Sequence, residues 1–169
     1  YTQLASVLPA DPTTGYVRKG IASGSEFNDI CEVDGQYIAV GRLSDTPYVA
    51  HASSLTGSWT NITSTAKLDN YQYGQAVGVK YGNGYIVILT SMGYISYSQS
   101  ISGPWTRTRA FTKATQDYFK LSFANGYFFV SVSESDSDSS ERGALYYAQN
   151  PSGTWTRKAN IFGSYDASS

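Results

Sequence analysis

Short apolar runs alternate with turn-forming residues along the chain, and the same succession of runs occurs three times. In each copy a pair of turn residues divides the first run from the second: Asp34-Gly35, Asn83-Gly84 and Asn125-Gly126. Such pairs accept positive φ angles easily and therefore predict tight β-hairpins. No long window keeps a helical period, and Thr, Val, Ile and Tyr dominate the runs, so the pattern predicts strands throughout.

Each copy is predicted to contain four strands. The first strands are expected at residues 26–33, 75–82 and 118–124, and the second at 36–42, 85–91 and 127–133. The third are expected at 47–53, 93–98 and 143–149, and the fourth at 59–63, 105–109 and 155–159, each fourth strand starting at a tryptophan. Four antiparallel strands that recur roughly every 45 residues are typical of a β-propeller blade. A simple β-meander is the alternative, but it gives no reason for Gly-x-Trp-Thr to recur at each fourth strand.

The predicted fold class is therefore all-β, with propeller-type blades, as one domain. Its repeats are residues 26–74, 75–117 and 118–160, preceded by residues 1–25 and followed by 161–169, which are expected to supply a partial fourth blade or closing strands. Three blades do not close easily into a ring, and open sheet edges favour pairing with other strands. We therefore expect a homo-oligomer, or a chain that belongs to a larger propeller or assembly.

Composition and charge argue against nucleic-acid binding and against a membrane span. Twelve basic and 13 acidic residues nearly balance, and charged residues make up only 15% of the chain, so a phosphate-binding surface for nucleic acid is not expected. The apolar runs are shorter than the roughly 20 residues that span a membrane. The single cysteine, Cys31, lies in an apolar strand pattern and is predicted to be a buried thiol. The chain does not begin with Met, so we expect a processed chain or a fragment.

The turn before each tryptophan carries a family resemblance. The turns read Ser53-Ser54-Leu55-Thr56-Gly57-Ser58-Trp59, Gln99-Ser100-Ile101-Ser102-Gly103-Pro104-Trp105 and Gln149-Asn150-Pro151-Ser152-Gly153-Thr154-Trp155. They resemble the Asp-box of sialidase-type propellers, the Gly-Pro-Trp turn of five-bladed furanosidase-type glycosidases, and the propeller repeats of phage tail proteins. Ser54, Ser100 and Asn150 replace the Asp of the Asp-box, and the glycine is one residue closer to the tryptophan. The resemblance implies a propeller in which the tryptophans pack between sheets.

In propellers the innermost strands line a central funnel, so their first residues are candidate site residues. Aligned on the hairpin glycine, Glu26, Gln75 and Asp117 share one position, and Asp29, Gly78 and Lys120 share a second. Strand alternation turns the second set to the other face unless a β-bulge intervenes. Glu26 and Asp117 are the alternative catalytic pair, the acid and base of a glycoside hydrolase. The resemblance also implies an arginine cluster or a third acid, and the sequence shows neither at the funnel position.

Binding without catalysis is the preferred hypothesis. Tyr71 and Tyr73 lie among Asp69, Asn70 and Gln75, which combines aromatic rings with short hydrogen-bonding groups and suits a sugar. With Asp29 and Lys120 these residues form the predicted ligand site. The sequence therefore predicts a carbohydrate-binding or adhesion module, extracellular or virion-associated, whose partner is a glycan. A glycoside hydrolase and a structural scaffold are the alternatives. No cofactor and no metal are expected, since the one histidine, His51, has no recognisable partners.

Overall fold

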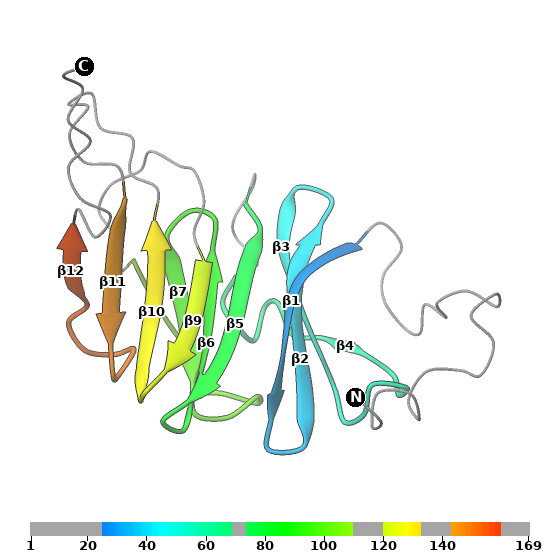
Figure 1. Ribbon diagram of the computed structural model, residues 1–169. Coiled ribbons are helices and arrows are strands. Elements are labelled where there is room, and N and C mark those ends of the chain that lie inside the picture. Colours follow the sequence, from blue (N-terminus) through cyan, green and yellow to red (C-terminus); the bar gives the residue numbers. More distant parts are fainter. Residues whose placement is uncertain (1–24, 69–73, 110–119, 133–142, 160–169) are drawn as a thin grey trace, which may run out of the picture.

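The computed structural model describes residues 25–68, 74–109, 120–132 and 143–159. They form three antiparallel sheets of four strands each, and each sheet is called a blade here (Figure 1). Blade 1 contains β1 (Ser25–Val33), β2 (Gln36–Leu43), β3 (Thr46–Ala52) and β4 (Thr60–Asn61). Blade 2 contains β5 (Ala76–Gly82), β6 (Tyr85–Thr90), β7 (Tyr94–Ser98) and β8 (Thr106–Arg109). Blade 3 contains β9 (Lys120–Ala124), β10 (Tyr127–Val132), β11 (Ala144–Ala148) and β12 (Thr156–Ala159).

The three first hairpins have the predicted geometry. At the first turn position φ is 48° at Asp34, 49° at Asn83 and 47° at Asn125, and the glycine that follows is also positive in each case. Two consecutive positive φ angles define the turn whose twist matches that of paired strands. The prediction of four antiparallel strands in every repeat is confirmed, with boundaries that differ by no more than two residues. The fourth strands begin one residue after the tryptophan.

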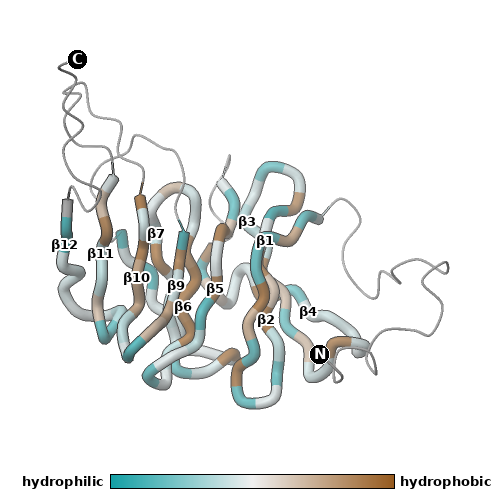
Figure 2. Tube along the Cα trace, viewed as in Figure 1, coloured by the Kyte–Doolittle hydropathy of each residue, from teal (hydrophilic) through white to brown (hydrophobic). Residues whose placement is uncertain are grey.

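The blades stand side by side, with β1, β5 and β9 as neighbouring innermost strands (Figure 1). One apolar core lies between blades 1 and 2 and joins Ile38 and Val40 of β2 to Ile86 and Ile88 of β6. A second core lies between blades 2 and 3, and the apolar residues that form it run along the middle of the strands (Figure 2). Blade 2, which lies between the other two, therefore buries both of its faces.

Alternation along β6 distinguishes the two faces. Ile86 and Ile88 pack in the core shared with blade 1, whereas Val87 and Leu89 pack in the core shared with blade 3. We call the face toward the preceding blade the leading face and the face toward the following blade the trailing face. Because the hairpin turns align all three blades, each position can be assigned to one of these faces.

The innermost strands of blades 1 and 2 each contain a β-bulge. In β1 the pairing shifts between Phe27 and Asp29, and in β5 it shifts between Ala76 and Gly78. The first bulge requires a glycine opposite it, because a Cβ on Gly41 would lie 1.8 Å from the carbonyl oxygen of Glu26. These bulges decide which side chains meet at the innermost strands.

The predicted strands within residues 1–24 lie outside the described residues, as does the C-terminal segment 161–169. In the part of the chain that the structure describes, there is no helix with the length and apolarity to cross a membrane.

Candidate functional site

The bulges place the two predicted site positions of the innermost strand, those of Glu26 and Asp29 in blade 1, on the same face. Glu26 pairs with Arg42 and Asp29 pairs with Val40, two residues apart on β2, so the side chains of Glu26 and Asp29 share the trailing face. Without the extra residue Asn28, their spacing of three would have put them on opposite faces. The β-bulge that Asp29 and Gly78 need in order to share a face with Glu26 and Gln75 is therefore present in blades 1 and 2.

Glu26 is held by a two-pronged ion pair. Arg42 Nε lies 2.9 Å from Glu26 Oε2, and Arg42 Nη2 lies 3.0 Å from Glu26 Oε1. The hydrogen bond from the Arg42 guanidinium lowers the pKa of the Glu26 carboxyl, and the charge of Arg42 adds to the effect. A glycosidase acid needs a raised pKa, so this arrangement does not suit Glu26 to donate a proton.

Asp29 links blade 1 to blade 2. Its Oδ2 accepts a hydrogen bond of 3.0 Å from the backbone N–H of Val79 and a second bond from the Lys80 ammonium group. Beside it, the Asn28 amide donates to the side chain of Gln75 at 3.0 Å and to the carbonyl of Ala76 at 2.9 Å. The polar groups predicted as a ligand site thus satisfy one another across the blade boundary, which gives them a structural role.

The third blade approaches the same point. A Cβ on Gly78 would lie 3.0 Å from Leu121 Cβ and 3.6 Å from Asp29 Oδ2, so the innermost strands of all three blades meet here. Lys120, next to Leu121, is exposed, and within the described residues it has no hydrogen bond or ion pair. Asp69, Asn70, Tyr71, Tyr73 and Asp117 lie outside the described residues. Their role in a site stays a prediction.

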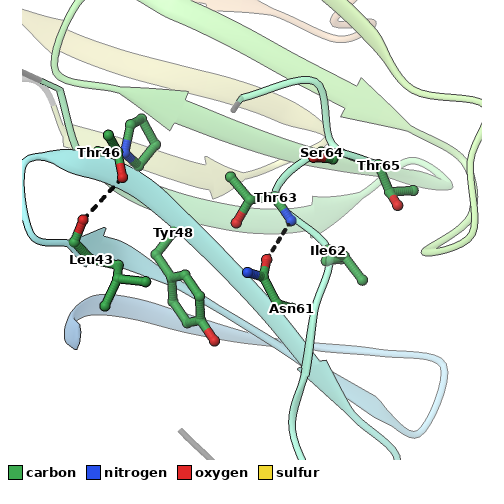
Figure 3. A pocket seen from close by; sticks show the side chains of 9 residues that line it. Leu43, Thr46, Tyr48, Asn61, Ile62, Thr63, Ser64 and Thr65 are labelled. Carbon is green, nitrogen blue, oxygen red and sulfur yellow. Dashed lines mark hydrogen bonds between the residues drawn. The ribbon is translucent and has the colours of Figure 1, made fainter. Parts of the chain in front are cut away.

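A hollow of about 360 Å³ lies elsewhere, at the outer strands of blade 1 (Figure 3). Tyr48 of β3 and Asn61 of β4 line it together with a polar segment that follows β4. The full lining consists of Leu43, Thr46, Pro47, Tyr48, Asn61, Ile62, Thr63, Ser64 and Thr65. One aromatic ring, a few aliphatic groups and five short polar side chains surround the space, and none of the nine is charged.

Hydrogen bonds fix the polar rim of the hollow. Asn61 Oδ1 accepts a bond of 2.9 Å from the backbone N–H of Thr63 (Figure 3), and this leaves the Asn61 amide hydrogens as donors. The Thr63 hydroxyl is engaged with β3, since it accepts a bond of 2.9 Å from the N–H of Val49. The Thr46 hydroxyl donates to the carbonyl of Leu43 at 3.0 Å. Asn61 is thus held in one orientation with its donors available.

Comparison with blade 2 explains why the hollow exists. The sheet registers make Tyr48 equivalent to Tyr94, and Asn61 equivalent to Arg107. In blade 2 two guanidinium groups cover this tyrosine, with Arg107 Cζ 5.7 Å and Arg109 Cζ 5.6 Å from the centre of the Tyr94 ring. Blade 3 also has an arginine, Arg157, at the position of Asn61. Short side chains in blade 1 leave a hollow where blade 2 has arginines, although Tyr48 itself is only 4% exposed because its ring packs edge to face on Phe27, with ring centres 5.9 Å apart.

The sequence did not predict the hollow, because the candidate residues were placed on the innermost strands and on the loops that lead into them. The available signal was the second residue of each fourth strand, which is Asn61 in the first repeat and arginine in the other two. Among the described residues no group of three or more His, Cys, Asp or Glu side chains could hold a metal ion.

Comparison with known proteins bears on the fold. No protein-family model and no curated protein matches the chain. Solved structures do match, among them YCF48 bound to a D1 peptide, with 18% identity, a TM-score of 0.55, and coverage of 84% of this chain and 42% of that one. An α-L-arabinofuranosidase from Clostridium thermocellum matches with 14% identity, a TM-score of 0.51 and coverage of 82% and 52%. The chain has a propeller-type fold.

A computationally designed protein, Ika4, also matches the chain, with 10% identity, a TM-score of 0.50 and coverage of 83% of this chain and 76% of that one. The propeller chain spans about half the length of the first two neighbours. The expected likeness to furanosidase-type propellers is thus confirmed at the level of fold. The resemblance to sialidases and to phage tail proteins stays a prediction.

Proposed function

We propose that this chain is a non-catalytic carbohydrate-binding module of an extracellular or virion-associated protein, and that the hollow beside Tyr48 is its sugar site. The observation that carries the proposal is the chemistry of the lining, which combines a tyrosine, Pro47 and Leu43 with short hydroxyl and amide groups and contains no carboxylate. Adhesion to a surface glycan is the corresponding role.

Sugars present apolar C–H faces edged by hydroxyl groups, so their sites combine an aromatic or aliphatic wall with short hydrogen-bonding side chains. Asn61, fixed by its bond to Thr63, supplies donors on one side, and Ser64 and Thr65 supply hydroxyl oxygens on the other. The volume of 360 Å³ is at the lower end of the usual range for small-molecule sites, about 300–1,000 Å³. We therefore expect a terminal sugar residue rather than a long chain to be bound.

The experiment is a glycan array with the wild-type chain, followed by titration calorimetry with the best ligand on Asn61→Arg. This variant fills the hollow with the side chain found at the same register in blades 2 and 3, so the fold should tolerate it. Thr60→Arg is the matched control, since it adds the same charge on the adjacent residue of β4, which alternates to the other face.

We expect Asn61→Arg to weaken binding at least about tenfold, since it removes a hydrogen-bonding partner and occupies the site. Thr60→Arg should bind like the wild type. The proposal fails if no glycan binds, or if Asn61→Arg binds as tightly as Thr60→Arg.

A glycoside hydrolase, or a piece of one, is the second candidate. It is favoured by the exposed carboxylate of Glu26 on an innermost strand, because Arg42 lowers the pKa of this carboxyl, which therefore suits the base rather than the acid of a glycoside hydrolase. An aryl glycoside panel that includes arabinofuranosides, compared between the wild type and Glu26→Gln, tests it. Turnover that disappears in Glu26→Gln would support catalysis, and its absence in the wild type would remove this candidate for the chain alone.

A further inference from the structure

The trailing face of blade 3 carries three aromatic side chains. The ring centres of Tyr127 and Phe129 lie 6.2 Å apart, those of Tyr127 and Tyr147 lie 5.9 Å apart, and those of Phe129 and Tyr147 lie 6.3 Å apart. Phe129 and Tyr147 are cross-strand partners and Tyr127 is two residues from Phe129, so all three point to the same side of the sheet. All three are only partly buried.

The same positions in blade 2 form the contact with the next blade. Tyr85 and Tyr97, the equivalents of Tyr127 and Tyr147, meet edge to face with ring centres 6.3 Å apart and an interplanar angle of 70°. The pair in blade 3 repeats this geometry at 5.9 Å and 71°. In blade 2 the pair packs against the core that includes Leu121 and Phe128 of blade 3. The aromatic group is therefore a blade-to-blade contact that blade 3 presents again without a described partner.

The neighbouring positions on the trailing face support the same conclusion. Val87 of blade 2 and its equivalent in blade 1, Ile38, are both 0% exposed, whereas blade 3 has Phe129 at this position. The next trailing position is Val40 in blade 1 and Leu89 in blade 2, both buried, but it is the exposed Ser131 in blade 3. The trailing face of blade 3 thus keeps the aromatic part of an inter-blade surface, and its exposed polar residues are Ser131, Lys120 opposite it and Ser122 opposite Phe129.

The leading face of blade 1 lies at the opposite end of the array, and no described blade precedes it. Ile30, on the leading face of β1, is 49% exposed, whereas its equivalents Val79 and Leu121 are 0% and 3% exposed because the preceding blade covers them. Trp59 and Trp155 are partly exposed, while Trp105 at the same position of blade 2 is 2% exposed. Blade 1 therefore leaves Ile30 accessible at a position that blades 2 and 3 bury, whereas Ala39 and Ala50 on the same face are already buried.

We propose that the trailing face of blade 3, formed by Tyr127, Phe129, Ser131 and Tyr147, docks onto the leading face of blade 1 of a second copy of this chain. Every inter-blade contact in the structure joins a trailing face to a leading face, so this interface continues an established one. Two such contacts related by a twofold axis would join the blades of two chains into one ring of six. Six is within the usual range of about four to eight blades.

Docking would bring the partner chain to the edge of the hollow beside Tyr48 without filling it. In blade 2 the equivalent side chains, Arg107 and Arg109, remain exposed, although Arg107 Nη1 donates a bond of 3.1 Å to the carbonyl of Lys67 in blade 1. The inference therefore does not depend on sugar binding, and the two can fail separately.

The experiment is light scattering and sedimentation of the wild-type chain over micromolar concentrations, with variants on each face. Ser131→Glu places a charge in the interface at a position that is exposed in the single chain, so folding should be unaffected. We expect its dimer dissociation constant to rise about tenfold or more, because the new carboxylate would lie beside its cross-strand partner Lys120 and this charged pair would lose its water on docking. Ser131→Val, which restores the aliphatic residue of the other blades, should lower the constant about tenfold.

Ile30→Glu tests the other face and should weaken association as much as Ser131→Glu. Mixing the two variants should restore association through one intact contact, since one chain keeps an intact leading face and the other an intact trailing face, while the second contact carries both substitutions. Leu55→Glu and Met92→Glu, at exposed apolar residues on turns, are the controls and should associate like the wild type.

A monomeric wild type would overturn the proposal. So would a dimer that is unaffected by Ile30→Glu, because two blade 3 faces would then meet each other across the twofold axis. Loss of association together with unchanged glycan binding, or the reverse, separates this interface from the sugar site.

Discussion

The repeated tryptophan provides the sharpest test of the packing. Trp105 is 2% exposed and lies in the core between blades 1 and 2, and its indole N–H donates a bond of 3.0 Å to the carbonyl of Ile101. Trp59 occupies the same position of its repeat but is partly exposed and belongs to neither core. Replacing each by alanine therefore compares one chemical change in two environments.

The expected cost of Trp105→Ala follows from its burial. Truncating a buried tryptophan costs about 3–5 kcal/mol of unfolding free energy, and loss of the indole hydrogen bond adds about 0.5–1.5 kcal/mol. Domains have a total of about 5–15 kcal/mol, so this variant should be close to unfolding. Trp59→Ala should cost only about 1 kcal/mol, the usual value for a partly exposed side chain.

Urea unfolding followed by far-ultraviolet circular dichroism measures both values. The variants should be made in the Ser131→Glu background, so that association does not contribute to the comparison. Trp105→Phe should be intermediate, since it keeps an aromatic ring and loses the hydrogen bond. Equal losses of stability for Trp105→Ala and Trp59→Ala would refute the assignment of the tryptophan to the space between blades.

Two further predictions concern titrating groups. Cys31 is partly buried rather than buried as predicted, because it packs at the edge of the core between blades 1 and 2. This partial burial raises the pKa of the Cys31 thiol, so iodoacetamide should label it more slowly in the folded chain than in urea at pH 8, and equal rates would contradict the shift. Arg42→Ala should raise the pKa of Glu26, measured by NMR titration, and an unchanged value would show that the ion pair does not form in solution. Because folding lowers the pKa of Glu26, any stability from this pair is present at neutral pH and lost as the pH falls through the folded-state value.

Local signals predicted the strands well because each strand end has its own chemistry. Asp34-Gly35 and its two counterparts specify a turn without help from the rest of the chain. The tryptophan marks the fourth strand because the space between blades requires a large aromatic there, as it does at Trp105. These signals are short in range, so they can be read from the sequence.

The site could not be predicted in the same way because it depends on register between strands. The sequence of β1 itself does not predict the bulge at Asn28. The residue that indicates it is Gly41 on the neighbouring strand, where a Cβ would clash with the Glu26 carbonyl. Likewise the hollow depends on Asn61 lying beside Tyr48, which requires the pairing of β3 with β4. The predicted cluster around Gln75 used sequence proximity instead, and Gln75 turned out to bond Asn28 of the preceding blade.

Departures from the repeat are more informative about function than the repeat itself. Equivalent positions of the blades need similar side chains to fill the space between neighbouring blades. Where one blade has a different residue, either that packing is missing or the residue has another role. Asn61 replaces an arginine that elsewhere covers a tyrosine, and Ser131 replaces an aliphatic residue that elsewhere is buried. If folding of the single chain alone had selected them, reverting Asn61 to arginine and Ser131 to valine would leave binding and association unchanged. If they serve a ligand and a partner, Ser131→Val should leave the unfolding free energy of the monomer within about 0.5 kcal/mol. Asn61→Arg should lower it by only about 0.5–1.5 kcal/mol through loss of the bond from Thr63, and each substitution should change only its own interaction.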